Sequence, residues 1–153
     1  MHLNDETFST VLDSTPLVSL DLVVRRKNGD VLLGQRVNRP AKDYWFVPGG
    51  RIYKNESLGK AFERLTKVEL GEAFAIKDAT LLGPYDHFYE DSVFGNTPST
   101  HYVAIAYVID VPLLNNLPLQ QHSAYQWATL EQLKSDSGIH KHTRVYFEHE
   151  FFD

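Results

Sequence analysis

The chain has 153 residues, of which 42% are hydrophobic and 23% charged, as in a globular protein with a sizeable core. Its formal net charge of -5 argues against a surface for nucleic acid or anionic membrane, and the absence of cysteine excludes disulfides and thiolate metal sites. We find no composition break, internal repeat, apolar run of membrane-spanning length or secretory signal pattern. We therefore expect one cytoplasmic domain over residues 1–153.

The first third of the chain predicts a helix and a strand hairpin. We place the helix, the first strand, the turn and the return strand at residues 4–13, 17–26, 28–30 and 31–35. Either Asn4 or Asp5 can cap the helix. Asp21 puts a carboxylate inside the otherwise apolar first strand, which is a costly position unless the group has a partner or a function.

The middle of the chain predicts a strand, a glycine turn and a helix. The strand at residues 44–47 runs into Pro48-Gly49-Gly50, where glycine lets the backbone turn and leaves peptide groups open to a ligand. A loop follows, and then a helix over residues 57–70, with Asn55 as its cap and Gly71 as its stop.

Strands dominate the rest of the chain, and helices follow them. We expect strands at residues 79–89, 101–111 and 125–128, an exposed loop at 90–99, and helices at 130–134 and 139–152. This order favours an α+β fold, an α/β/α sandwich in which helices flank a mixed β-sheet.

The predicted central helix carries a carboxylate on its apolar side. Apolar residues recur at helical spacing at Leu58, Ala61, Phe62, Leu65 and Val68. Glu69 follows Leu65 by one turn and points along the same stripe. A carboxylate facing the core must form an ion pair or hold a cation, so two interpretations stay open: a salt bridge with an arginine, or a ligand for Mg²⁺.

The same segment resembles the Nudix box, G-x5-E-x7-R-E-U-x-E-E-x-G-U, in which U is bulky and aliphatic. Its fixed positions are matched by Gly50, Glu56, Arg64, Glu69 and Gly71. Leu65 and Val68 stand where the box has glutamates, and Thr66 and Glu72 where it has aliphatic residues. With these departures the chain resembles, nearly end to end, the branch of GDP-mannose mannosyl hydrolases.

This resemblance implies a Nudix fold, a homodimer, and Mg²⁺-dependent hydrolysis of GDP-mannose or GDP-glucose to GDP and the free sugar. Water would attack the anomeric carbon and invert it. One alternative is a conventional Nudix diphosphatase, which yields a nucleoside monophosphate and a sugar phosphate. Another is a non-catalytic sensor of nucleotide sugars.

Arginines near the glycine turn are candidates for phosphate binding. A single arginine is more often solvated or ion-paired than functional. The resemblance implies that Arg36, Arg51 and Arg64 bind phosphate, and that Arg36 is also catalytic. Arg64 can instead pair with Glu56 and hold the box in shape.

Gln121-His122 is the second candidate group. Such a pair in an irregular stretch most often faces solvent. The resemblance implies that Gln121 holds Mg²⁺ together with Glu69 and the carbonyl of Gly49, and that His122 is the general base. A neutral imidazole near pH 7 suits proton abstraction from water.

The remaining candidates concern the sugar and the nucleotide. Asp21 can be a satisfied core carboxylate or an edge position, or else a contact to sugar hydroxyls or to a basic neighbour. The resemblance places His87 and Tyr102 at the sugar and diphosphate, and Phe8 with the backbone of His2 and Leu3 at the nucleotide.

Three further sites carry no chemistry in this interpretation. We expect Tyr89 to be a packing aromatic residue. We expect His140-Lys141-His142 and His149-Glu150 to be helix surface, because neither has a partner at metal-ligand spacing.

Overall fold

The structure, a computed structural model, describes residues 2–114, 117 and 124–153. Within them one sheet has the strand order β3-β2-β1-β6-β5, with β4 added to β1 and β7 to β2. The strands are β1 Leu17–Arg25, β2 Val31–Gln35, β3 Trp45–Phe46, β4 Gly49–Arg51, β5 Thr80–Tyr89, β6 Thr100–Asp110 and β7 Tyr125–Ala128. Because β1 and β6 are parallel and β1 and β2 antiparallel, the sheet is mixed, as predicted.

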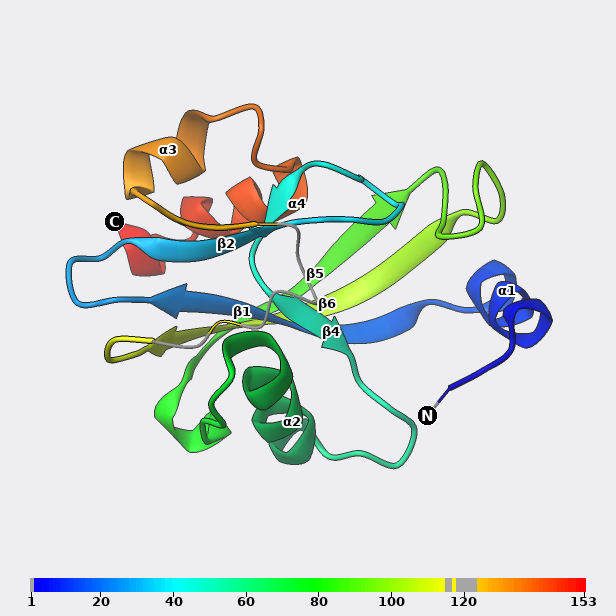
Figure 1. The fold of residues 1–153 in the computed structure, drawn as a ribbon, viewed down its shortest axis with the longest axis horizontal. Helices are drawn as coiled ribbons and strands as arrows, with labels where there is room; N and C mark the ends of the chain where they lie inside the picture. Colours follow the sequence, from blue (N-terminus) through cyan, green and yellow to red (C-terminus); the bar gives the residue numbers. More distant parts are fainter. Residues whose placement is uncertain (1, 115–116, 118–123) are drawn as a thin grey trace.

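Helical segments cover both faces of the sheet (Figure 1). One face carries α2 (Leu58–Leu70), and the other carries α3 (Leu130–Ser135), α4 (Lys141–Arg144) and the 3₁₀ turns η2 (Val145–Glu148) and η3 (Glu150–Phe152). Helix α1 (Asp5–Ser14) lies beyond one end of the sheet, and a 3₁₀ turn η1 (Ile76–Asp78) follows α2. The α/β/α sandwich is thus confirmed. Among the described residues, no helix combines the length and apolarity needed to cross a bilayer.

Strand β1 is apolar on both sides because a separate core covers each of its faces. Leu20 and Leu22 belong to the core beneath α2, together with Phe62. Val23 belongs to the opposite core, together with Tyr146 of η2. A strand buried on both faces reads as a continuous apolar run, which is why β1 was recognisable from sequence.

Side-chain caps define where the helices begin. Asn4 caps α1 and Thr129 caps α3. The cap of α2 is Ser57, whose Oγ accepts a backbone N–H at 3.2 Å, so the prediction that Asn55 caps this helix is wrong. Asn55 instead takes a left-handed conformation in the loop, with φ of 67°. Gly71, with φ of 81°, ends α2 as predicted.

The glycines expected in a turn form a strand. Gly49–Arg51 is β4, which pairs antiparallel with β1 and sets Gly49 opposite Asp21. The backbones approach so closely that a Cβ on Gly49 would lie 2.3 Å from the carbonyl oxygen of Leu20. Glycine is required here for close contact and not for turning the chain.

The C-terminal segment is not the single helix predicted over residues 139–152. Extended backbone at His140 and His149, with ψ of 145° and 141°, divides it into α4 with η2 and then η3. The Nδ1 atom of each histidine accepts a backbone N–H from two residues further on, at 3.0 Å. Such local bonds compete with helix continuation.

We predict that Gly49→Ala destabilises the protein by about 1–3 kcal/mol or more, because the new methyl group overlaps the β1 backbone. Gly59→Ala is the matched control, since a Cβ there meets only Ile76 Cγ2, at 3.6 Å. Alanine is favoured in a helix, so this variant should be neutral or slightly more stable. Urea unfolding of both variants measures the difference, and equal stabilities would contradict the close approach.

Candidate active site

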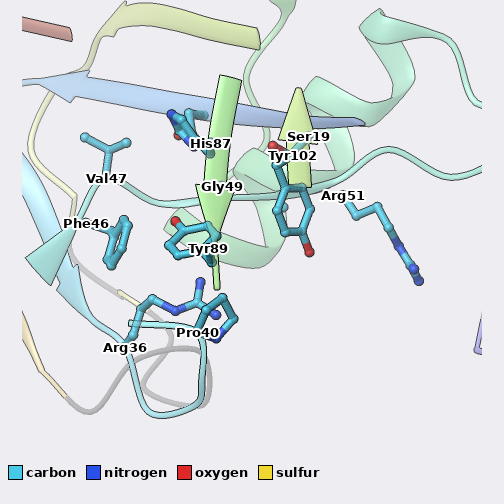
Figure 2. A pocket seen from close by; sticks show the side chains of 12 residues that line it. Ser19, Arg36, Pro40, Phe46, Val47, Gly49, Arg51, His87, Tyr89 and Tyr102 are labelled. Carbon is cyan, nitrogen blue, oxygen red and sulfur yellow. The ribbon is translucent and has the colours of Figure 1, made fainter. Parts of the chain in front are cut away.

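A small cavity of about 110 Å³ opens beside the β1–β4 pair (Figure 2). Several predicted site residues line it, namely Asp21, Arg36, Gly49, Arg51, His87 and Tyr102. Pockets that enclose a drug-sized ligand usually measure about 300–1,000 Å³. This cavity by itself is therefore too small to enclose a ligand of that size.

Two arginines provide positive charge at this pocket. Arg36 follows β2, and its guanidinium carbon lies 5.6 Å from the centre of the Phe46 ring. Arg51 ends β4, and its guanidinium carbon lies 4.8 Å from the centre of the Phe8 ring. In Figure 2 Arg36 lies beside Pro40 and Tyr89, whereas Arg51 lies on the other side of Tyr102 and extends away from it. Their planar donor groups are suited to phosphate oxygens.

Asp21 is a satisfied carboxylate that also lines the pocket. The hydroxyl of Tyr146 donates a hydrogen bond to its Oδ2. Burial raises the pKa of Asp21 to about 6, even though this hydrogen bond and the charge of Arg36 favour ionisation. Asp21 thus has a hydrogen-bond partner within the protein, and its contact with sugar hydroxyls stays a proposal.

Histidines gather beside this pocket. His87 is buried, and its ring stacks on His142 with centroids 4.5 Å apart, while His140 stacks on Phe46 at 4.7 Å. The expectation that His140 and His142 lie on a helix surface is wrong, because α4 packs them partly buried against these rings. Burial, with repulsion from neighbouring imidazoles, lowers the pKa of His87 to about 3 and that of His140 to about 4.

Arg64 lies outside the pocket lining and forms an ion pair. Its Nε donates to Glu56 at 2.7 Å, and its Nη2 donates to the carbonyl of Arg51 at 2.9 Å. Its guanidinium carbon also lies 3.9 Å from the centre of the Tyr53 ring. These contacts connect α2 to β4. They agree with the second interpretation of Arg64, in which it pairs with Glu56 and stabilises the shape of the Nudix-like segment.

Glu69 is buried, as the helical periodicity predicts, with 5% of its surface exposed. The apolar stripe is narrower than expected, since Leu58 and Val68 are 43% and 39% exposed. Leu65 faces β4 so closely that its Cδ2 would lie 2.6 Å from a Cβ on Gly50. Glu69 lies one turn further along the same face.

Oxygen donors of β4 and α2 are of the type that a hard cation prefers. Within the described part of the chain, no cluster of three or more His, Cys, Asp or Glu side chains is arranged to hold a metal ion. Mg²⁺ needs less, because it binds one or two carboxylates and completes its shell with water and phosphate oxygens. By donor type alone, the buried carboxylate of Glu69 and the backbone carbonyl of Gly49 are oxygen ligands of the kind that Mg²⁺ takes.

Some predicted residues are not brought into the pocket lining. Gln121 and His122 lie outside the described residues. His2 and Leu3 precede α1 and do not line the cavity, and Phe8 reaches it only through its contact with Arg51.

Two aromatic residues have more to do with the pocket than their sequence context suggests. Tyr89 lines the cavity together with His87. The two residues are two positions apart on β5 and therefore face the same side of the sheet, which is a signal that the sequence contains. Tyr146 contacts Asp21 across 125 positions of sequence, and no local pattern indicates such a pairing.

Comparisons with known proteins agree on the family. The NUDIX domain model matches residues 15–149. The chain is 41% identical over 122 residues to "Low-salt glycan biosynthesis protein Agl8" of Haloferax volcanii, which covers 80% of this chain and 76% of that protein. It is 31% identical over 96 residues to an ADP-ribose pyrophosphatase of Methanocaldococcus jannaschii, covering 63% and 52% of the two chains. Among solved structures, a MutT NUDIX hydrolase from Burkholderia pseudomallei matches with a TM-score of 0.71 and 28% identity, over 90% and 99% of the chains.

We predict that His87→Gln changes how stability depends on pH. An unfolded histidine takes up a proton below about pH 6.5, whereas the lowered pKa keeps native His87 neutral, so acid favours the unfolded wild type. Between pH 7.5 and 5 the unfolding free energy of the variant should therefore gain about 2 kcal/mol relative to wild type.

Urea unfolding at both pH values measures this relative change. The comparison with wild type is needed because native Asp21 takes up a proton in the same range and acts in the opposite direction. His2→Gln, at an exposed position, controls for loss of one histidine. A parallel pH profile for wild type and His87→Gln would contradict the prediction.

Proposed function

The chain belongs to the Nudix family, and we propose that it hydrolyses a nucleotide sugar, GDP-mannose or GDP-glucose, to GDP and the free sugar. The observation that carries this proposal is the pair of apolar side chains that α2 has at two positions of the Nudix box. Leu65 is buried against Gly50 and Val68 is exposed, at two positions where the Nudix box has glutamates. Fewer carboxylates remain to hold metal and present water to phosphorus, so attack at the sugar carbon is favoured.

The arginines would stabilise the departing nucleoside diphosphate. Arg36 and Arg51 provide fixed positive charge at the pocket, where charge develops as the glycosyl bond breaks. Glu69, the Gly49 carbonyl and Gln121 would hold Mg²⁺, which when bound neutralises negative charge on the diphosphate. Arg64, already paired with Glu56, would act on phosphate only indirectly, by fixing the position of Arg51.

Water would attack the sugar, at the carbon that is bonded to the diphosphate. We propose that His122 takes a proton from water as its oxygen attacks the anomeric carbon, while the bond from that carbon to the diphosphate oxygen breaks. Attack on the face opposite the leaving group gives the inverted sugar, β-D-mannose from GDP-α-D-mannose. Asp21, His87 and Tyr102 line the cavity where the sugar would bind.

The nucleotide would extend along the rim toward α1. Phe8 of α1 already contacts Arg51, so the N-terminal segment with His2 and Leu3 lies on the side where the base would emerge. The cavity of about 110 Å³ leaves the nucleotide outside. A second copy of the chain in a homodimer would be one way of covering it.

The relatives support a sugar-bearing nucleotide as the substrate class. The similar Haloferax protein is named for glycan biosynthesis. The similar Methanocaldococcus protein is named an ADP-ribose pyrophosphatase, which supports the alternative of cleavage within the diphosphate. Products separate the two reactions: GDP with free sugar, or GMP with a sugar 1-phosphate.

We predict that reaction in H₂¹⁸O with Mg²⁺ and GDP-mannose gives GDP without label and mannose with one labelled oxygen. NMR identifies the products and the first-formed anomer, and mass spectrometry locates the label. Label in a phosphate product would establish the diphosphatase alternative. Binding of nucleotide sugar without Mg²⁺-dependent turnover of any member of a nucleotide-sugar panel would establish a sensor.

We also predict that Glu69→Gln weakens metal binding at least tenfold. The substitution removes the buried negative charge and keeps a side chain of nearly the same size. Glu72→Gln is the matched control, since Glu72 is exposed just beyond α2. Titration with Mn²⁺, followed by electron paramagnetic resonance, measures affinity independently of turnover. Equal affinities for the two variants would remove Glu69 from the metal site.

A further inference from the structure

A buried tyrosine connects the pocket to the C-terminal segment. Tyr146, in η2, is fully buried, and its hydroxyl is the middle member of a hydrogen-bonded chain. On one side it donates to Oδ2 of Asp21, and on the other it lies 3.1 Å from Nε2 of His87. Both of those partners line the cavity, whereas Tyr146 does not.

The directions of these two hydrogen bonds determine which ring nitrogen of His87 carries the hydrogen. A tyrosine hydroxyl has one proton and can donate one hydrogen bond, and Tyr146 donates it to Asp21. The hydrogen bond between Tyr146 and His87 must then be donated by the imidazole, so Nε2 carries hydrogen and Nδ1 carries a lone pair. The reversed arrangement would need a protonated Asp21 carboxyl group that donates to Tyr146.

The His87 ring is held in its plane by a different neighbour. His142 stacks on it with an interplanar angle of 6°, and Nε2 of His142 is itself 3.1 Å from the carbonyl oxygen of Phe88. Stacking sets the ring plane but does not distinguish the two nitrogens. The contact with Tyr146 does, because it involves Nε2 alone.

We propose that Tyr146 is a positioning residue, which orients the Asp21 carboxylate and holds His87 as the Nε2–H tautomer so that both groups present acceptors to the hydroxyl groups of the sugar. This rests on the proposed function only for the identity of the ligand. The tautomer of His87 is a property of the free protein. Tyr146 acts through its two partners and touches no substrate.

Tyr146→Phe tests this inference, because it removes the hydroxyl and keeps the buried ring. Tyr85→Phe is the matched control, since Tyr85 packs edge-on against Tyr146 at 4.8 Å in the same region. At pH 7.5, long-range ¹H–¹⁵N NMR spectra should show His87 as the Nε2–H tautomer in wild type and in Tyr85→Phe. In Tyr146→Phe that signature should be replaced by a mixture of tautomers.

Kinetics with the nucleotide sugar give the second readout. Loss of one orienting hydrogen bond should lower kcat/KM roughly tenfold in Tyr146→Phe, mainly through KM, and leave Tyr85→Phe within about twofold of wild type. An Nδ1–H tautomer in wild type, or an unchanged tautomer in Tyr146→Phe, overturns the inference. The wild-type spectrum decides this even where the variant fails to fold.

The proposed function can fail separately from this inference. If wild type releases a sugar 1-phosphate, the proposed glycosyl cleavage is wrong, while the tautomer data still establish or overturn the role of Tyr146. If wild type releases free sugar and the spectra show no dependence on Tyr146, only the positioning role is wrong.

Discussion

The contact on which the site depends is the close pairing of two backbones, β4 against β1. With no Cβ at Gly49, its peptide group lies directly beside Leu20 and Asp21. This pairing holds the beginning of the Nudix segment against a strand that is buried on both faces. Helix α2 then packs on β4 through Leu65, and Arg64 fastens the arrangement from outside by bonding to the carbonyl of Arg51. A side chain at this crossing would separate the glycine segment from the carboxylate of Asp21.

The electrostatics of the pocket follow from its position at the edge of the core. Arg36 and Arg51 keep their permanent charge near solvent, while Asp21 and His87 lie deeper, where burial disfavours the charged form of each. A protein of net charge -5 thereby presents positive charge locally to an anionic ligand. At neutral pH the deeper groups are a neutral imidazole and a carboxylate, and both can accept hydrogen bonds from hydroxyl groups.

The proposed reaction class rests on carboxylates that α2 lacks. In a helix of this family, carboxylates at several positions provide metal ligands and orient water for attack on phosphorus. Here a buried leucine and an exposed valine occupy two of them, and Leu65 has become part of the contact with β4. Under the proposed function, a packing residue at such a position would change the available chemistry and leave the fold intact, because the helix gains apolar contact where it lacks a charge.

The sequence by itself determined the elements whose signals are local: the strand runs of β1 and β2, the hairpin between them, the Gly71 stop and the inward direction of Glu69. The sequence placed the start of α2 correctly to within two residues, but the prediction of Asn55 as its cap was wrong, because Ser57 caps the helix. Only the tertiary structure decided that Gly49–Arg51 is a strand, since its hydrogen bonds come from β1, and that the last helix is interrupted. It alone joined Tyr146 to Asp21 and packed His142 on His87, because contacts between distant segments leave no periodicity in the chain.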